Sequence, residues 1–185
     1  MRKWNALISA GALALFLIHM IAGIFQLTGF LPGGQTLLQA LTGIMTFLVA
    51  AHAVIAVKLT ADTLKALKRA GRSYFRENTV FWARRISGLC LMAMMPVHAA
   101  VFSGRGGEAY RLPVFEGPQL AAGLILVLSL AVHILSNIRP LLISFGIAGF
   151  RIYVKDVLFV LAVVLAVAAA AFVIYYLRWN VLWRP

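Results

Sequence analysis

The chain has 185 residues, of which 63% are hydrophobic and 12% are charged, with a formal net charge of +12 and a mean hydropathy of +0.94. Because soluble domains are usually about half apolar or less, this composition excludes a soluble enzyme or binding module and indicates an integral membrane protein. The single cysteine, Cys90, excludes both a disulfide framework and a thiolate metal cluster.

Five stretches are apolar for long enough to cross a hydrocarbon core at 1.5 Å per residue. Short polar connections separate them, so we expect an all-α membrane protein in which residues 1–185 form a single transmembrane domain. In chain order the predicted helices cover about 6–28, 37–57, 82–102, 119–138 and 156–177.

The basic residues gather in alternate connections, which argues against nucleic acid as the partner and for a bilayer with anionic lipid or a docked protein subunit. Cytoplasmic loops are enriched in Lys and Arg, so we expect the N-terminus in the cytoplasm and the C-terminus outside. The predicted cytoplasmic side carries Arg2, Lys3, Lys58, Lys65, Lys68, Arg69, Arg72, Arg76, Arg84, Arg85, Arg139, Arg151 and Lys155, and the other side carries Arg105, Arg111, Arg178 and Arg184.

Each of the first four apolar stretches contains one histidine, and the fifth contains none. They are His19, His52, His98 and His133. An ionisable ring in hydrocarbon is costly and usually marks a functional site, although one such histidine alone could equally form an interhelical hydrogen bond.

The depth of each histidine can be counted from the nearest basic residue on its own helix. The shallow pair, His52 and His133, lies six residues, or about 9 Å, from the basic boundary. The deep pair, His19 and His98, lies sixteen and thirteen residues, or about 20–24 Å, from it. The histidines therefore form two layers about 10–15 Å apart, each with two rings from different helices.

Two imidazoles at one depth suit the two axial positions of haem iron. Zinc would need three or four ligands at one point, whereas all the acidic residues lie in loops or at helix ends: Asp62, Glu77, Glu108, Glu116 and Asp156. We therefore expect an outer haem iron held by His19 and His98 and an inner one held by His52 and His133.

Haem propionates need donors at the membrane edge, and cations and a tryptophan lie at the inner boundary. We expect cofactor contacts from Arg85, Trp82 and Arg139, with Arg84, Asn5 and Ser9 as further candidates, although interfacial anchoring would also explain them. Glycines would let flat rings or neighbouring helices approach closely: Gly11, Gly23, Gly43, Gly88 and Gly123.

Four segments in order resemble one family over nearly the whole chain. They are ALALFLIHMIAG, LVAAHAVIAVK, FWARRISGLCLMAMMPVHAAVF and LSLAVHILSNIRPLLISFG. They resemble the dihaem cytochrome b membrane anchor of fumarate reductases and succinate dehydrogenases, the five-helix type with two b haems.

The resemblance implies that the first four of the five helices form a haem-binding bundle in a bacterial inner (cytoplasmic) membrane. It implies two haem b groups, a membrane quinone, often menaquinone, and flavoprotein and iron–sulfur subunits on the cytoplasmic face. The chain would be the electron-transfer and quinone-reactive subunit of an oxidoreductase complex, with the dicarboxylate chemistry on its partners. A dimer of the whole complex would also fit the resemblance.

The chain departs from the family at two places. Some members have a glutamate two residues before the helix-4 histidine, where this chain has Ala131, and some have an acidic residue in the loop after helix 1, whereas GFLPGGQTL has none. The candidates for a quinone site are Glu108, Glu116 and Gln26, and Gln35 is a candidate on the same ground as Gln26. An ordinary solvated loop carboxylate remains the alternative for the two glutamates.

Two other functions stay open from the sequence. One is the b-type dihaem subunit of another membrane oxidoreductase, such as a hydrogenase or formate dehydrogenase. The other is a haem-free transporter or assembly protein whose histidines form hydrogen bonds or carry protons.

Overall fold

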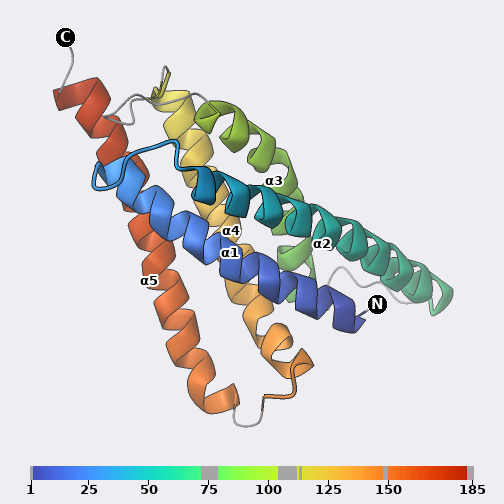
Figure 1. Ribbon diagram of the computed structural model, residues 1–185. Coiled ribbons are helices and arrows are strands. Elements are labelled where there is room, and N and C mark those ends of the chain that lie inside the picture. Colours follow the sequence, from blue (N-terminus) through green and yellow to red (C-terminus); the bar gives the residue numbers. More distant parts are fainter. Residues whose placement is uncertain (1, 72–78, 104–111, 113, 148–149, 183–185) are drawn as a thin grey trace.

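The fold is all-helical within the residues that the computed structural model describes, which are 2–71, 79–103, 112, 114–147 and 150–182 (Figure 1). Five long helices follow one another, and a short π-helical segment, η1 (Arg178–Leu182), continues the last one. Each of the five long helices is long and apolar enough to cross a membrane. The long helices are α1 (Arg2–Thr28), α2 (Thr36–Arg69), α3 (Thr79–Phe102), α4 (Gly117–Ser144) and α5 (Phe150–Leu177).

The helices contain the five apolar stretches but extend beyond them. The largest difference is in α2, which continues past Lys58 for eleven residues to Arg69. That extension is rich in Leu, Ala and Lys, which favour helix, and it ends where Gly71 takes a φ of 66°. Helix length here follows backbone propensity and capping, whereas the expected boundaries followed apolarity alone.

The helices are arranged as two hairpins and a fifth helix. α1 packs against α2, α3 packs against α4, and α5 packs against both α4 and α1. The two hairpins meet through a smaller contact between α1 and α4, while α2 has no extensive backbone contact with α3 or α4. α2 also has no buried residue. We call the region between the α1–α2 hairpin and the α3–α4 hairpin the seam.

The tightest core lies beside the seam, among α1, α4 and α5. Tyr175 is 1% exposed, and its hydroxyl accepts a hydrogen bond from the backbone N–H of Leu112 at 2.7 Å. A Cβ at Gly123 would lie 3.2 Å from the ring of Phe172, so this glycine serves the close packing of α4 on α5. Side-chain packing in this core therefore holds α5 against the bundle. Other residues make the contacts across the seam.

The outer surface of the bundle is apolar, as a bilayer requires. Large side chains such as Phe47, Leu128 and Phe159 are each two-thirds exposed or more. A water-soluble monomer rarely exposes so much contiguous apolar surface. Together with the five spans, this surface supports a multi-pass membrane protein.

Candidate functional site

The four histidines meet in two pairs across the seam. His19 on α1 faces His98 on α3, and His52 on α2 faces His133 on α4. In both pairs the ring centroids are 6.2 Å apart and the ring planes are inclined at 77°. Each pair thus joins two helices that belong to different hairpins, and the structure brings together the same residues that share a depth in the sequence.

Behind His52 stands a hydrogen-bonded serine. The Ser9 hydroxyl donates to the carbonyl oxygen of Asn5 at 2.6 Å, and the same oxygen lies 2.9 Å from Nδ1 of His52. A hydroxyl has one hydrogen to give. When Ser9 gives it to Asn5, the hydroxyl oxygen can accept a hydrogen bond from His52 in the tautomer that carries its proton on Nδ1.

His19 has the same arrangement with a threonine. The Thr42 hydroxyl donates to the carbonyl oxygen of Leu38 at 2.7 Å and lies 3.1 Å from Nδ1 of His19. The Thr42 oxygen can therefore accept from His19 in the tautomer with its proton on Nδ1.

His133 repeats the pattern with a longer contact. The Ser87 hydroxyl donates to the carbonyl oxygen of Arg84 at 3.2 Å and lies 3.3 Å from Nδ1 of His133. The imidazole also rests directly on α3, because a Cβ at Gly88 would lie 3.3 Å from its Cε1. Gly88 thus makes room for a ring, whereas Gly11 faces Leu48 on α2.

His98 is held differently. Among the described residues its Nδ1 is buried and has no hydrogen-bond partner. The ring is instead packed among aromatic side chains, with the centroid of Phe102 at 4.7 Å and that of Phe172 at 6.5 Å.

With the proton on Nδ1, the hydroxyls are the acceptors for His52, His19 and His133, and the Nε2 lone pair is left for another partner. Within the described residues no Nε2 of the four histidines takes part in a hydrogen bond, and none is fully buried. In metal sites the ligating histidine commonly donates its other N–H to a neighbouring acceptor, which sets its tautomer and orientation. The arrangement behind these rings is of that kind.

The spacing of the rings also suits one metal ion between them. A metal–nitrogen bond is about 2.0 Å, and bond lengths of about 1.3–1.4 Å place a ring nitrogen about 1.1 Å from the ring centre. Two imidazoles bound on opposite sides of one ion would then have centroids about 6.2 Å apart, and 6.2 Å is observed in both pairs. A direct edge-to-face contact between two unliganded rings can have a similar separation, so the 6.2 Å spacing fits both arrangements.

Only two ligating side chains meet at each position. Among the described residues, no group of three or more His, Cys, Asp and Glu side chains lies close enough together to hold a metal ion. Within the described residues, each pair therefore brings together two imidazoles and no further side chain of these types.

The cations predicted to meet the cofactor lie near the inner pair in different ways. Arg84 uses its Nε to donate to the carbonyl oxygen of Ser136 at 2.9 Å. Arg85 is half-buried, its guanidinium lies 5.0 Å from the centroid of Phe81, and its Nε has no hydrogen-bond partner within the described part of the chain. It also acts electrostatically on both His52 and His133. A buried guanidinium nitrogen without a partner beside this pair fits an anionic group bound there.

The other two edge residues are less informative. Trp82 is half-buried at the start of α3 and contacts the ring of Phe81, with centroids 5.4 Å apart. Arg139 is exposed on α4. Their contact with a cofactor stays a prediction.

The predicted quinone residues have local roles where the structure describes them. Glu116 is the N-cap of α4 and forms a capping box with Gln119. Gln26 donates to the carbonyl oxygen of Pro32 at 3.3 Å and so closes the turn after α1. Gln35 is the N-cap of α2 without a side-chain cap bond, and Glu108 lies outside the described residues.

Sequence reasoning missed the partners of the histidines. Thr42 and Ser87 were not singled out, and Ser9 was assigned to a propionate, whereas it contacts His52. Counting residues from the basic boundary, as was done for the histidines, would have identified two of these partners. Ser9 is six residues past Lys3, as His52 is six before Lys58, and Thr42 is sixteen before Lys58, as His19 is sixteen past Lys3.

Comparisons of the chain with models of protein families, with curated protein sequences and with solved structures find no match.

Proposed function

We propose that the chain is the membrane-anchor cytochrome b of a succinate:quinone oxidoreductase, a fumarate reductase or succinate dehydrogenase, with two haem b groups. The observation that carries the proposal is the two facing histidine pairs, each with ring centroids 6.2 Å apart and with Nε2 left without a hydrogen bond. The four sequence segments that resemble the family supply the choice among haem proteins.

In this proposal the inner haem is held by His52 and His133, and the outer one by His19 and His98. An iron porphyrin held between two imidazoles supplies one-electron transfer at a potential set by its ligands and surroundings. The chain's own share is to hold the rings: Ser9, Ser87 and Thr42 keep the proton on Nδ1 and stop the rings from turning. Arg85 offers a charged donor to a carboxylate beside the inner pair.

Electrons would pass between a membrane quinone and an iron–sulfur and flavoprotein pair on the cytoplasmic face. The basic connections support that face as a docking surface, and the extension of α2 adds Lys65, Lys68 and Arg69, all of them exposed. The quinone, menaquinone in many relatives of this type, would take or give the electrons at the other end of the haem pair.

A haem count tests the proposal. Purified protein should give two b haems per chain in a pyridine haemochrome assay, and circular dichroism should show the same preparation to be helical. A helical protein that binds no haem when expressed with an adequate haem supply would disprove the proposal and favour the transporter or assembly reading.

The partners separate this function from that of another dihaem subunit. Affinity purification of the full chain from its native membrane should recover a covalently or tightly bound flavin and iron–sulfur clusters, together with succinate oxidation or fumarate reduction. Recovery of a nickel or a molybdenum subunit in their place would assign the chain to a hydrogenase or a formate dehydrogenase.

A further inference from the structure

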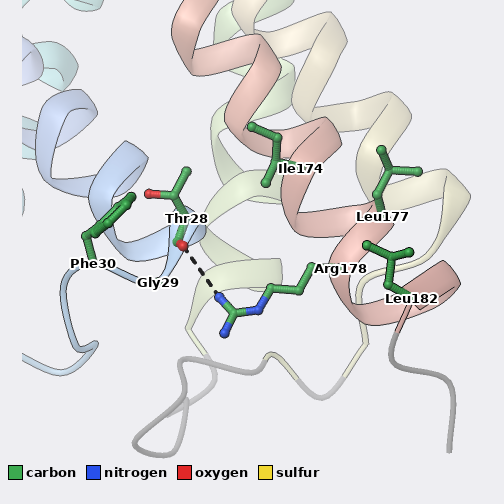
Figure 2. A pocket seen from close by; sticks show the side chains of 7 residues that line it. All are labelled: Thr28, Gly29, Phe30, Ile174, Leu177, Arg178 and Leu182. Carbon is green, nitrogen blue, oxygen red and sulfur yellow. Dashed lines mark hydrogen bonds between the residues drawn. The ribbon is translucent and has the colours of Figure 1, made fainter.

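A groove runs between the end of α1 and the end of α5, on the opposite end of the bundle from the extension of α2 (Figures 1 and 2). It has a volume of about 610 Å³ and is open along its length, unlike an enclosed chamber. Its lining residues are Thr28, Gly29, Phe30, Ile174, Leu177, Arg178 and Leu182. We call it the α1–α5 groove.

The walls of the groove are apolar and exposed. Phe30 is 81% exposed and Leu182 is 75% exposed, and both flank the groove in Figure 2. Ile174 and Leu177 continue the apolar wall along α5, each between 40% and 50% exposed. In a membrane protein such a wall faces lipid chains.

One cation sits in this apolar setting. The Arg178 guanidinium reaches across the groove to the carbonyl oxygen of Thr28, with Nη1 at 3.4 Å, as the dashed line in Figure 2 marks. A long bond of this kind satisfies one of the five N–H donors of a guanidinium. None of the residues that line the groove is acidic, so no carboxylate in its walls balances the charge.

The loop is shaped to admit that guanidinium. Gly29 has a φ of 88°, and a Cβ at this position would overlap Nη1 of Arg178. The backbone N–H groups of Gly29 and Phe30 are used by the carbonyls of Gln26 and Phe25. The donors left for a ligand therefore belong to Arg178.

In a bilayer spanned by these helices, the groove would lie close to the lipid headgroups. It is formed where two membrane-spanning helices end, and Trp179, whose ring centroid is 5.0 Å from the Arg178 guanidinium carbon, follows directly. Tryptophan is enriched at this boundary between hydrocarbon and water. A ligand here meets a positive charge at the polar level and an apolar wall below it.

We propose that the α1–α5 groove binds one phospholipid of the leaflet at this end of the bundle. The phosphate lies on the guanidinium of Arg178, for which planar two-point hydrogen bonding suits phosphate oxygens. An acyl chain runs along Ile174 and Leu177. A neutral quinone would leave the charge of Arg178 unbalanced, so the charge favours the lipid. The inference does not depend on the haem proposal.

Native mass spectrometry of the full chain in a mild detergent tests the site. Wild-type protein delipidated and then supplied with phosphatidylglycerol should retain one lipid, and Arg178→Gln should lower its affinity by about tenfold or more, as expected for losing one charged contact. Arg178→Lys keeps the charge without the fork and should lie between them. Ile174→Trp keeps the guanidinium but blocks the acyl path, and it should also reduce retention.

Matched variants control for charge and for bulk. Arg69→Gln removes an exposed cation at the end of α2, and Val160→Trp adds an exposed ring elsewhere on α5; both should retain lipid as the wild type does. Equal retention of lipid by Arg178→Gln and wild type would overturn the proposal.

Two further ligands distinguish the sources of binding. Diacylglycerol, which has no phosphate, and inorganic phosphate alone should each bind at least about tenfold more weakly than phosphatidylglycerol. If diacylglycerol bound as tightly as phosphatidylglycerol, Arg178 would have no role in binding the phosphate and the proposal would fail. If inorganic phosphate alone bound as tightly, the groove would be an anion site and not a lipid site. A quinone that displaces the lipid from the wild type, and whose own binding is lost in Arg178→Gln, would reassign the groove to the quinone.

Discussion

The inner and outer histidine pairs have the same geometry but different support. In both, the centroids are 6.2 Å apart and the planes are inclined at 77°. In the inner pair Nδ1 of each ring contacts a serine hydroxyl, whereas in the outer pair only His19 has a hydroxyl partner within the described residues. The fourth ring, His98, is held by the side chains of Phe102 and Phe172.

This difference separates two ways to position a ligand. Helix packing brings the rings to the same separation in both pairs, because Cβ positions follow from the helices. Hydrogen bonds then fix the tautomer and the ring orientation, and they make the imidazole a stronger donor to a metal. Aromatic packing fixes orientation but not tautomer. Under the proposed function, we therefore expect the outer site to hold its haem more weakly than the inner site, with His98 as its weaker ligand.

The largest expected effect comes from removing a ligand. His52→Ala and His133→Ala should each abolish the inner centre and leave one haem per chain, while His19→Ala and His98→Ala should abolish the outer one. The haem count and the redox titration of the α-band should show the surviving centre near its original potential. Loss of both haems in every variant, with helicity intact, would mean that the centres are not independent.

External ligands should distinguish the two centres next. Carbon monoxide added to the reduced wild type should bind at the outer centre by displacing His98, with an affinity at least about tenfold above that of the inner centre. Because the inner centre is absent from His52→Ala and the outer one from His19→Ala, the spectra of these two variants identify which centre responds. Equal binding to both centres would contradict the idea that the hydroxyls matter.

Removing one hydroxyl should have a smaller effect. Ser9→Ala leaves Nδ1–H of His52 without an acceptor, at a cost of about 1–3 kcal/mol, and should lower the affinity for the inner haem by about tenfold. Thr46→Ala is the control, because this exposed hydroxyl on α2 bonds to the Thr42 carbonyl and contacts no histidine.

The Ser9→Ala variant can also be examined in the haem-free protein. Nitrogen-15 spectra of the haem-free protein labelled at histidine distinguish Nδ1–H from Nε2–H. Wild-type His52 should be in the Nδ1–H form, and Ser9→Ala should show a mixture. A mixture in the wild type would refute the hydroxyl assignment while leaving the haem count to decide the function.

The smallest effect is expected at Gly88. The Cβ of Gly88→Ala would lie 3.3 Å from Cε1 of His133, so the ring must move by a few tenths of an ångström. We expect a modest shift in the α-band of the inner haem and no change in the α-band of the outer haem. Gly43→Ala, where the added Cβ meets nothing within 4 Å, should change neither.

Some of this arrangement follows directly from the sequence. The five spans were expected from apolar length, and the facing of His52 with His133 and of His19 with His98 follows from depth because helix rise is constant. Their role as ligands stays a prediction. The hydroxyls were harder to identify, because a serine or threonine in a membrane helix usually bonds to the carbonyl of its own preceding turn, and Ser9 and Thr42 do this as well.

Other features depend on local backbone chemistry that apolarity does not reveal. The continuation of α2 beyond Lys58 reflects helix propensity in a polar segment. Glu116 and Gln26 were singled out for their polar groups, but Glu116 caps the start of α4 and Gln26 closes the turn after α1.

The attachment of α2 mainly through α1 has a consequence for biogenesis. Since its close backbone neighbour is α1, the part of the bundle made by α1, α4 and α5 can reach its final packing while α2 is still able to swing. Under the proposed function, we expect each haem to enter late, from the side between α2 and α3. Its two histidine ligands would then link the α1–α2 hairpin to the α3–α4 hairpin. Newly made chains starved of haem should therefore be cut by proteases in α2 while α5 stays protected.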